Sequence, residues 1–310
     1  MTGSIISGWG YSLPEKVLTN KDFEAMFDTS DSWIVERTGI RERHIGSSTS
    51  EMAREASTIA MGRANLTPED VGTFILSTTT PDQRVPATSS VVHDSLKLSC
   101  GAFDLNAACA GFVYALVVGE TMLQATNKTS LVVGADKLSE ITDYSDRSTA
   151  ILFGDAGGAV TLSPYEGTSC ILSWDLGVDG SLRDILYCDY GGYMKMVGKE
   201  VFRKAVRATV ASAEKVLDQA GIKPIDIAHF IPHQANIRIM DAVLERLSIP
   251  SERLVNVLDR TGNTSSASVP VALAVASDEG RLKDGDLILF SGFGAGLTWA
   301  SAIVRWGKDT

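Results

Sequence analysis

Three short segments of the chain carry side chains that could act together in covalent chemistry. Cys109 stands among small residues in segment 104–112, directly before an apolar stretch. His233 follows a short apolar run, and Asn263 lies in a polar turn that opens onto the apolar segment 269–275. A cysteine thiolate is a nucleophile, while imidazole and amide groups can donate hydrogen bonds to an oxygen that gains negative charge. Together these residue types could support nucleophilic chemistry with stabilisation of an oxyanion.

Each of these residues also has an ordinary structural interpretation. A cysteine near an apolar segment is commonly a small buried hydrophobe, although the start of a helix favours its thiolate. A histidine after a strand is commonly held by hydrogen bonds alone, and segment 262–268 also fits a helix cap. The other cysteines, Cys100, Cys170 and Cys188, form no C-x-x-C pair, so zinc and redox motifs are disfavoured.

Two glycine-rich segments could be taken for nucleotide-binding loops. Segment 292–296 is followed by the apolar run 297–304, which predicts a strand and not the helix that would hold a pyrophosphate. Clustered glycines there, and again at 154–158, indicate tight turns that present backbone N–H groups. We therefore predict no dinucleotide site.

Composition limits the class of protein. The chain has 310 residues and a formal net charge of −10, whereas a nucleic-acid binder is usually basic. Its beginning lacks a basic region followed by a long apolar stretch, and we expect no apolar run that approaches the length of a bilayer span. These features predict a cytoplasmic protein. They do not exclude a local basic patch for an anionic partner.

The chain is internally duplicated. Segment 66–75 is similar to segment 222–231, with Phe74 and Phe230 standing 156 residues apart. The same shift carries the apolar run 131–133 to 287–289 and Cys109 to Ser265, so we predict two similar halves, 1–168 and 169–310.

The pattern within each half is that of an α/β protein. Segments 51–64 and 200–220 have apolar residues at helical spacing, and segments 74–76 and 230–231 suit buried strands. Thr67 is a predicted helix cap. The sequence therefore predicts helices packed on the faces of buried sheets.

Taken in order, these segments resemble the thiolase superfamily and, within it, the β-ketoacyl-acyl-carrier-protein synthase III family. Segments 29–34, 37–44 and 146–155 add to the resemblance, which covers nearly the whole chain. It implies a five-layered αβαβα thiolase-like fold, a homodimer, and a catalytic group of Cys109, His233 and Asn263. The backbone N–H groups of Cys109 and Ala295 would form the oxyanion hole.

The resemblance also implies an activity and its partners. An acyl group would pass from acyl-coenzyme A to Cys109 and then condense with malonyl-acyl carrier protein after loss of carbon dioxide, which starts fatty acid synthesis. Coenzyme A is a substrate in this scheme, and neither a metal nor a tightly bound cofactor is expected. A related condensing enzyme of polyketide or quinolone synthesis is the nearest alternative, and a cysteine hydrolase is one from another class.

Further site residues follow from the resemblance alone. The residues expected to bind coenzyme A are Thr29, Trp33, Arg37, Arg147, Gly198 and Asn236. The residues expected to shape the tunnel and the acyl pocket are Val85, Phe153 and Phe293. The residues expected to dock the carrier protein are Arg203 and Arg238. Arg207 lies on the same helix face as Arg203 and fits either a docking role or an ordinary surface charge.

The sequence departs from the family pattern at three places. The loop 154–159 has two small residues exchanged, and Ala295 replaces a glycine, which preserves a backbone donor. Val85 stands where relatives often carry a larger residue that enters the partner's acyl pocket. We therefore expect a primer pocket that admits more than an acetyl group.

Overall fold

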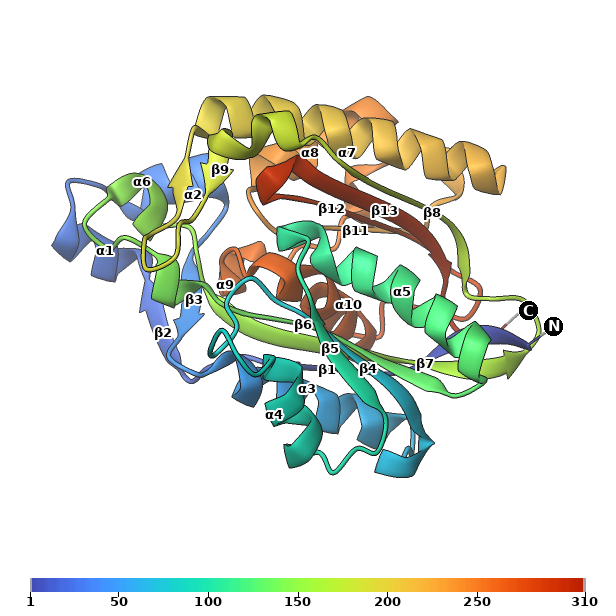
Figure 1. Cartoon of the computed structure of the whole chain (residues 1–310). Coiled ribbons are helices and arrows are strands. Elements are labelled where there is room, and N and C mark those ends of the chain that lie inside the picture. Colours follow the sequence, from blue (N-terminus) through green and yellow to red (C-terminus); the bar gives the residue numbers. More distant parts are fainter. Residues whose placement is uncertain (1, 309–310) are drawn as a thin grey trace.

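The computed structural model describes residues 2–308 as two sheets stacked with helices between and outside them (Figure 1). The first sheet has the strand order β1-β7-β6-β4-β5 and the second has the order β11-β12-β13-β8. The strands of the first sheet are β1 (Thr2–Ser12), β7 (Asp155–Glu166), β6 (Thr129–Lys137), β4 (Val71–Ser77) and β5 (Gly101–Leu105). Those of the second are β11 (His229–Pro232), β12 (Leu287–Gly294), β13 (Thr298–Arg305) and β8 (Ile171–Val178).

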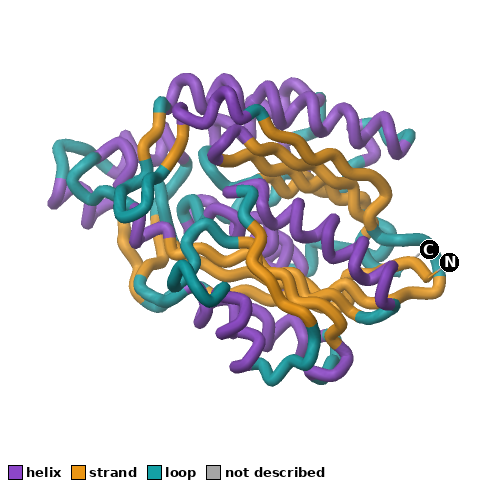
Figure 2. Tube along the Cα trace, viewed as in Figure 1, coloured by secondary structure: helices purple, strands orange, loops and turns teal. Residues whose placement is uncertain are grey.

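Helices form three layers around these sheets (Figure 2). The outer layer on the first sheet is α3 (Thr49–Arg63) and α4 (Thr88–Ser95). The central layer is α5 (Gly111–Thr126) and α10 (Ser268–Asp278), and the outer layer on the second sheet is α7 (Gly198–Ala220) and α8 (Ile237–Leu247). The predicted helices 51–64 and 200–220 correspond to α3 and α7. This five-layered arrangement confirms the predicted fold class.

Short elements complete the chain. Two small hairpins are β2 (Lys16–Thr19) with β3 (Glu42–Ile45), and β9 (Leu186–Tyr187) with β10 (Lys195–Met196). The short helices are α1 (Asn20–Met26), α2 (Asp31–Thr38), α6 (Arg147–Ala150) and α9 (Leu258–Thr261). The 3-10 turns are η1 (Pro68–Asp70), η2 (Ala108–Ala110), η3 (Leu138–Ile141), η4 (Gly180–Ile185), η5 (Pro224–Asp226), η6 (Ser251–Arg253), η7 (Ser265–Ala267) and η8 (Ala295–Leu297). Thr67 caps η1, where it donates from its N–H and its hydroxyl to Asp70, so the predicted cap starts a single 3-10 turn.

The position of each central helix explains its composition. α5 and α10 touch both sheets, so their side chains are buried on nearly every side, and both consist largely of apolar residues. α7 covers only one sheet and buries one stripe of side chains, as the helical spacing of its sequence predicted.

Segment 108–126 corrects one expectation from the sequence. It is long and apolar enough to cross a membrane by length and composition, whereas no such segment was expected. More than half of it is buried inside the fold, between the two sheets, which is the environment of a core helix. Small residues interrupt the apolar run of this segment, so its sequence did not suggest a length sufficient for a membrane span.

The two sheets repeat one topology. The order β1-β7-β6-β4 corresponds to β8-β13-β12-β11, with two antiparallel pairs followed by one parallel pair in each case. The shift between the copies is not constant, however. Phe74 pairs with Leu131 and Phe230 pairs with Leu289, so the shift has grown from 156 to 158 residues at β12. The predicted match of 131–133 to 287–289 is therefore two residues out of register.

The predicted boundary at residue 168 lies between the two sheets in the chain. β7 ends at Glu166 and β8 begins at Ile171. Side chains of α5 and α10 nevertheless share one hydrophobic cluster, so the halves do not have separate cores. The assignment of two domains stays a prediction.

Candidate active site

The turn that carries Cys109 is built from small residues because the backbone is crowded there. Ala108 has φ 49°, and Cys109 follows it in η2, immediately before α5. A Cβ on Gly294 would lie 2.5 Å from the backbone nitrogen of Cys109, and one on Gly111 would lie 2.1 Å from Oγ of Ser77. The end of β12 therefore approaches the cysteine turn only because glycine occupies position 294.

The surroundings of Cys109 favour the neutral thiol. Burial raises its pKa to about 12, and the charge of Asp136 adds to the rise, while a hydrogen bond from Ser265 opposes it. The start of a helix was expected to favour the thiolate, and desolvation by burial acts in the opposite direction. A nucleophilic role for Cys109 would therefore require the thiol to lose its proton during the attack.

His233 stands at the end of β11 and is almost fully buried. Its backbone N–H donates to the carbonyl of Ser291 at 2.7 Å, which holds it beside β12. Its ring meets the ring of Phe293 edge-on, with 5.7 Å between centroids, and its Nδ1 lies 2.7 Å from Oγ of Ser268. Burial lowers the pKa of His233 to about 3, so the imidazole is neutral at physiological pH.

Asn263 is held by backbone and side-chain hydrogen bonds after a turn at Gly262, which has φ 66°. Its N–H donates to the carbonyl of Leu152, and its own carbonyl accepts from Gly154. The N–H of Ser265 donates to Oδ1 at 3.0 Å. Because Oδ1 is engaged in this way, the NH₂ group is the end of the amide that remains for a ligand.

One cavity of about 1280 Å³ brings these three residues together. Cys109, His233 and Asn263 come from three separate segments and all border it. Other predicted site residues that border the same cavity are Trp33, Arg37, Phe153, Gly198, Asn236, Arg238, Phe293 and Ala295. Thr29, Val85, Arg147 and Arg203 are not among its lining residues.

At the outer part of the cavity, Trp33 is flanked by two arginines. The guanidinium carbon of Arg37 lies 4.6 Å from the centre of the Trp33 ring, and that of Arg147 lies 4.8 Å from it. A flat ring entering between Trp33 and Arg147 would therefore displace the guanidinium. Asn236 donates to the carbonyl of Arg37 at 2.9 Å and joins this cluster to the start of α8.

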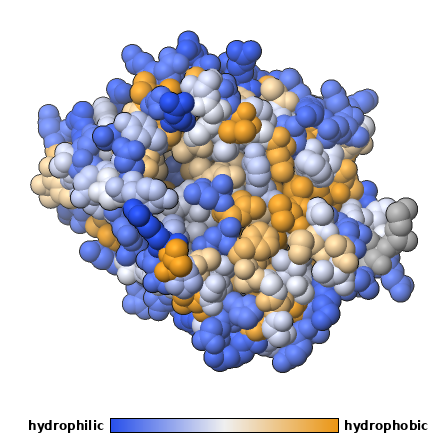
Figure 3. Space-filling view, in the orientation of Figure 1, coloured by the Kyte–Doolittle hydropathy of each residue, from blue (hydrophilic) through white to orange (hydrophobic). Residues whose placement is uncertain are grey.

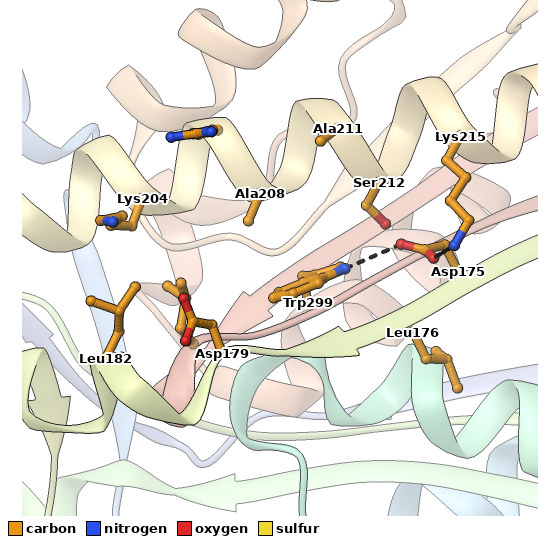
Figure 4. A pocket seen from close by; sticks show the side chains of 12 residues that line it. Asp175, Leu176, Asp179, Leu182, Lys204, Ala208, Ala211, Ser212, Lys215 and Trp299 are labelled. Carbon is orange, nitrogen blue, oxygen red and sulfur yellow. Dashed lines mark hydrogen bonds and ion pairs between the residues drawn. The ribbon is translucent and has the colours of Figure 1, made fainter.

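The basic residues of α7 point to different places. Arg203 is exposed and forms an ion pair with Glu200 at 2.6 Å. Arg207 borders a second cavity of about 520 Å³ between α7 and β13, together with Lys204 and Trp299. Figure 4 shows that groove, with the indole N–H of Trp299 donating to Asp175. Arg203 and Arg207 lie on the same face of the helix, but they do not line the same cavity.

Three buried polar residues at or near the cavity, of which Ser265 borders it, were not predicted from the sequence as functional candidates. Ser265 has φ 50° and is almost fully buried, and its side chain lowers the pKa of the Cys109 thiol. Ser268 contacts His233, and Asp136 accepts hydrogen bonds from Ser266. The repeat, which carries Cys109 close to Ser265, was the signal that could have found the first of them.

Among residues 2–308 there is no group of three or more histidine, cysteine, aspartate or glutamate side chains that could hold a metal ion. The expected independence from metals and tightly bound cofactors is not tested by this finding and stays a prediction.

Comparisons with known proteins give the family context of this site. Residues 103–180 match the family model described as 3-oxoacyl-[acyl-carrier-protein] synthase III. Residues 217–306 match the model of the C-terminal part of the same family. A β-ketoacyl-[acyl-carrier-protein] synthase III 1 from Bacillus anthracis is 46% identical over 98% of this chain and 99% of the relative.

Solved structures agree with these matches. The 3-oxoacyl-[acyl-carrier-protein] synthase III from Aquifex aeolicus VF5 superposes with a TM-score of 0.96 at 45% identity, covering 98% of this chain and all of that one. The priming β-ketosynthase of the R1128 polyketide pathway superposes with a TM-score of 0.94 at 33% identity, covering 99% of this chain and 97% of that one.

Proposed function

The chain belongs to the 3-oxoacyl-[acyl-carrier-protein] synthase III family of condensing acyltransferases that act in fatty acid synthesis, and from this premise we propose how its site works. Cys109 is the nucleophile that carries the acyl group, and His233 and Asn263 act in the condensation. The observation that carries the proposal is the meeting of these three side chains in one cavity.

In the first half-reaction the sulfur of Cys109 attacks the carbonyl carbon of an acyl-coenzyme A. The thiol proton leaves, the bond to the coenzyme A sulfur breaks, and coenzyme A departs as the free thiol. One thioester replaces another, so the exchange is nearly isoenergetic. The backbone N–H groups of Cys109 and Ala295 are proposed to hold the oxyanion, a role supported by the close approach that Gly294 allows.

In the second half-reaction a malonyl thioester on the carrier protein loses carbon dioxide and leaves an enolate. Neutral His233 and the NH₂ group of Asn263 donate hydrogen bonds to the enolate oxygen. A carboxylate in place of Asn263 would repel that oxygen. The carbanion attacks the acyl carbon, the bond to Cys109 breaks, and the 3-oxoacyl product stays on the carrier.

The substrate path is proposed to run from Trp33 and Arg37 to Cys109. Trp33 and Arg147 would hold the adenine and Arg37 a phosphate, with Thr29, Gly198 and Asn236 along the pantetheine. Phe153 and Phe293 border the inner cavity and would limit the acyl chain. Both arginines already lie against Trp33, so binding would exchange one stacked partner for another.

A homodimer is part of the proposal. β5 forms an edge of the first sheet, and an exposed edge strand is a template for pairing with a second copy. Figure 3 shows hydrophobic residues gathered over α5 and β5, and Phe103 on β5 is partly exposed. Val85 is 84% exposed in the single chain, as expected for a residue that enters a partner. We also expect the enzyme in the cytoplasm.

The test is the mass of the intact protein after incubation with a panel of acyl-coenzyme A compounds. The native chain should gain one acyl group, and the Cys109→Ala variant should gain none while keeping its fold. His233→Ala and Asn263→Ala should spare acyl labelling more than malonyl decarboxylation. Undiminished labelling of Cys109→Ala would refute the nucleophile, and equal loss of both steps in the other variants would refute their role.

A priming enzyme of polyketide synthesis is the second candidate, favoured by the structural likeness to the R1128 ketosynthase. The same residues would act on another donor or acceptor. Matched rates with malonyl-carrier protein and malonyl-coenzyme A, measured across several primers, separate the two. Release of free acid in place of a condensed product would instead indicate a hydrolase.

A further inference from the structure

Behind His233, on the side of the ring away from the cavity, lies the hydroxyl of Ser268. The distance from Nδ1 of His233 to Oγ of Ser268 is 2.7 Å, and both residues are buried. This is the single hydrogen bond of the imidazole within residues 2–308. The Ser268 hydroxyl therefore decides which ring nitrogen carries the proton of the neutral ring.

The hydroxyl has one proton and two acceptors within reach. One is Nδ1 of His233, and the other is the carbonyl oxygen of Ser265 at 2.8 Å. That carbonyl already accepts the backbone N–H of Ser268 at the end of η7. It is therefore satisfied without the hydroxyl, whereas a bare Nδ1 has no other donor in the part of the chain that the structure describes.

The two arrangements present different groups to the cavity, a hydrogen-bond acceptor in one case and a donor in the other. If the hydroxyl donates to Ser265, Nδ1 carries the proton and Nε2 presents a lone pair, which would repel an enolate oxygen. If the hydroxyl donates to Nδ1, the proton lies on Nε2, where it can be donated to that oxygen. Only the second arrangement matches the NH₂ group that Asn263 presents.

We propose that Ser268 is a positioning residue that donates its hydroxyl proton to Nδ1 of His233 and so keeps the imidazole proton on Nε2, facing the enolate. The inference rests on the proposed function and extends it. Ser268 does not touch substrate; it acts only through His233. The start of α10 supplies the hydroxyl at a fixed place, because Ser268 is its first residue.

The first test is nitrogen NMR of the native enzyme labelled with ¹⁵N-histidine. The sequence has 4 histidines, and the His233→Gln variant assigns the signal of the one at the site. The proposal expects a protonated Nε2 and an unprotonated Nδ1. A protonated Nδ1 in the free enzyme would overturn it, and this measurement needs no Ser268 variant to fold.

The second test compares the two half-reactions in variants. Ser268→Ala should lower the turnover of malonyl decarboxylation on the order of 10- to 100-fold, which is the effect of losing one hydrogen bond to an imidazole that faces a developing negative charge. The Michaelis constant should change little. Acyl labelling of Cys109 should stay nearly native, and Ser268→Thr, which keeps the hydroxyl, should restore much of the rate.

Ser173→Ala is the matched control, because Ser173 is also buried and its hydroxyl also donates to a backbone carbonyl, that of Val216 at 2.7 Å. Undiminished decarboxylation in Ser268→Ala, or an equal loss in the control, would refute the role of Ser268. Absence of Cys109 labelling in the native enzyme would refute the proposed function instead, and the NMR result would still decide the tautomer.

Discussion

Replacing Asp136 by asparagine should weaken the fold and at the same time make Cys109 more reactive. Asp136 is fully buried and forms none of the ion pairs found among residues 2–308. Its Oδ1 accepts from the residues Thr78, Thr79 and Thr80. Its Oδ2 accepts from the N–H and the hydroxyl of Ser266, at 2.9 and 2.6 Å.

The size of the stability loss follows from these contacts. If the asparagine oxygen takes the threonine side, its NH₂ group faces the N–H of Ser266, and a buried donor is left without an acceptor. An unsatisfied donor costs about 1–3 kcal/mol, and the remaining bonds lose the strength that the charge gave them. We expect a loss of about 2–4 kcal/mol, which corresponds to a melting temperature lower by roughly 3–6 °C for a chain of this length.

The effect on Cys109 has the opposite sign. Burial is the main cause of the raised thiol pKa, and the negative charge of Asp136 raises it further. Removing that charge should lower the thiol pKa, so alkylation by iodoacetamide at fixed pH should be faster in Asp136→Asn. Thermal unfolding and alkylation rates, both measured on protein shown to be folded by circular dichroism, test the two effects.

Asp175→Asn is the control for this prediction. Asp175 is also a buried carboxylate, but its partners are Lys215 on α7 and Trp299 on β13, and it does not border the cavity of Cys109. This variant should lose stability without a change in the alkylation of Cys109. A slower or unchanged alkylation rate in folded Asp136→Asn would show that the charge does not act on the thiol.

Three further predictions concern the primer, the carrier and the pH. Val85→Phe should narrow selectivity toward acetyl-coenzyme A, because overpacking a partner's pocket costs about 1–3 kcal/mol; an unchanged ratio of acetyl to longer primers in competition assays would contradict this. Arg203→Glu and Arg238→Glu should raise the Michaelis constant for malonyl-carrier protein and spare acyl transfer to the cysteine. The native carrier step should weaken with salt, since screening acts over about 8 Å at physiological ionic strength; unaffected carrier kinetics in both variants would put the docking face elsewhere. Because burial lowers the pKa of His233 to about 3, the folded enzyme binds fewer protons there than the unfolded chain below about pH 6.5. Stability should therefore fall on acidification, and thermal melts should show a smaller fall in His233→Ala.

The layers of the fold could be predicted from the sequence because helices in different layers have different patterns of apolar residues. α7 covers one sheet and shows a one-sided stripe, while α10 lies between two sheets and is apolar all round. The internal repeat pointed to the shared topology of the two sheets. It failed in register at β12, because a uniform shift cannot follow the two additional residues that the second half has between its paired strands.

From the sequence, the residues of the candidate site could be predicted only where the side chain is of a type that commonly takes part in catalysis. Cys109, His233 and Asn263 have such side chains, and the family resemblance joined them. Ser268 and Asp136 act through geometry that no local pattern records, since their partners lie 35 and 130 residues away in the chain. A serine at the start of a helix has an ordinary explanation as a cap, and this explanation hid its contact with His233.

The duplication itself gives the site its form. Ala108 in η2 and Ser265 in η7 stand 157 residues apart, and both adopt the left-handed conformation, with φ 49° and 50°. The two turns pack against each other, and a Cβ on Gly111 would lie 3.8 Å from that of Ser266. The first turn leads into a helix that begins beside the nucleophile. The second fixes the amide of Asn263 through a backbone N–H and reaches His233 through Ser268. Because a left-handed residue other than glycine is held only by its surroundings, a change that relaxes one turn should disturb the other. The proposed nucleophile and the groups proposed to stabilise the enolate are therefore coupled through these two turns, although they come from different halves of the chain.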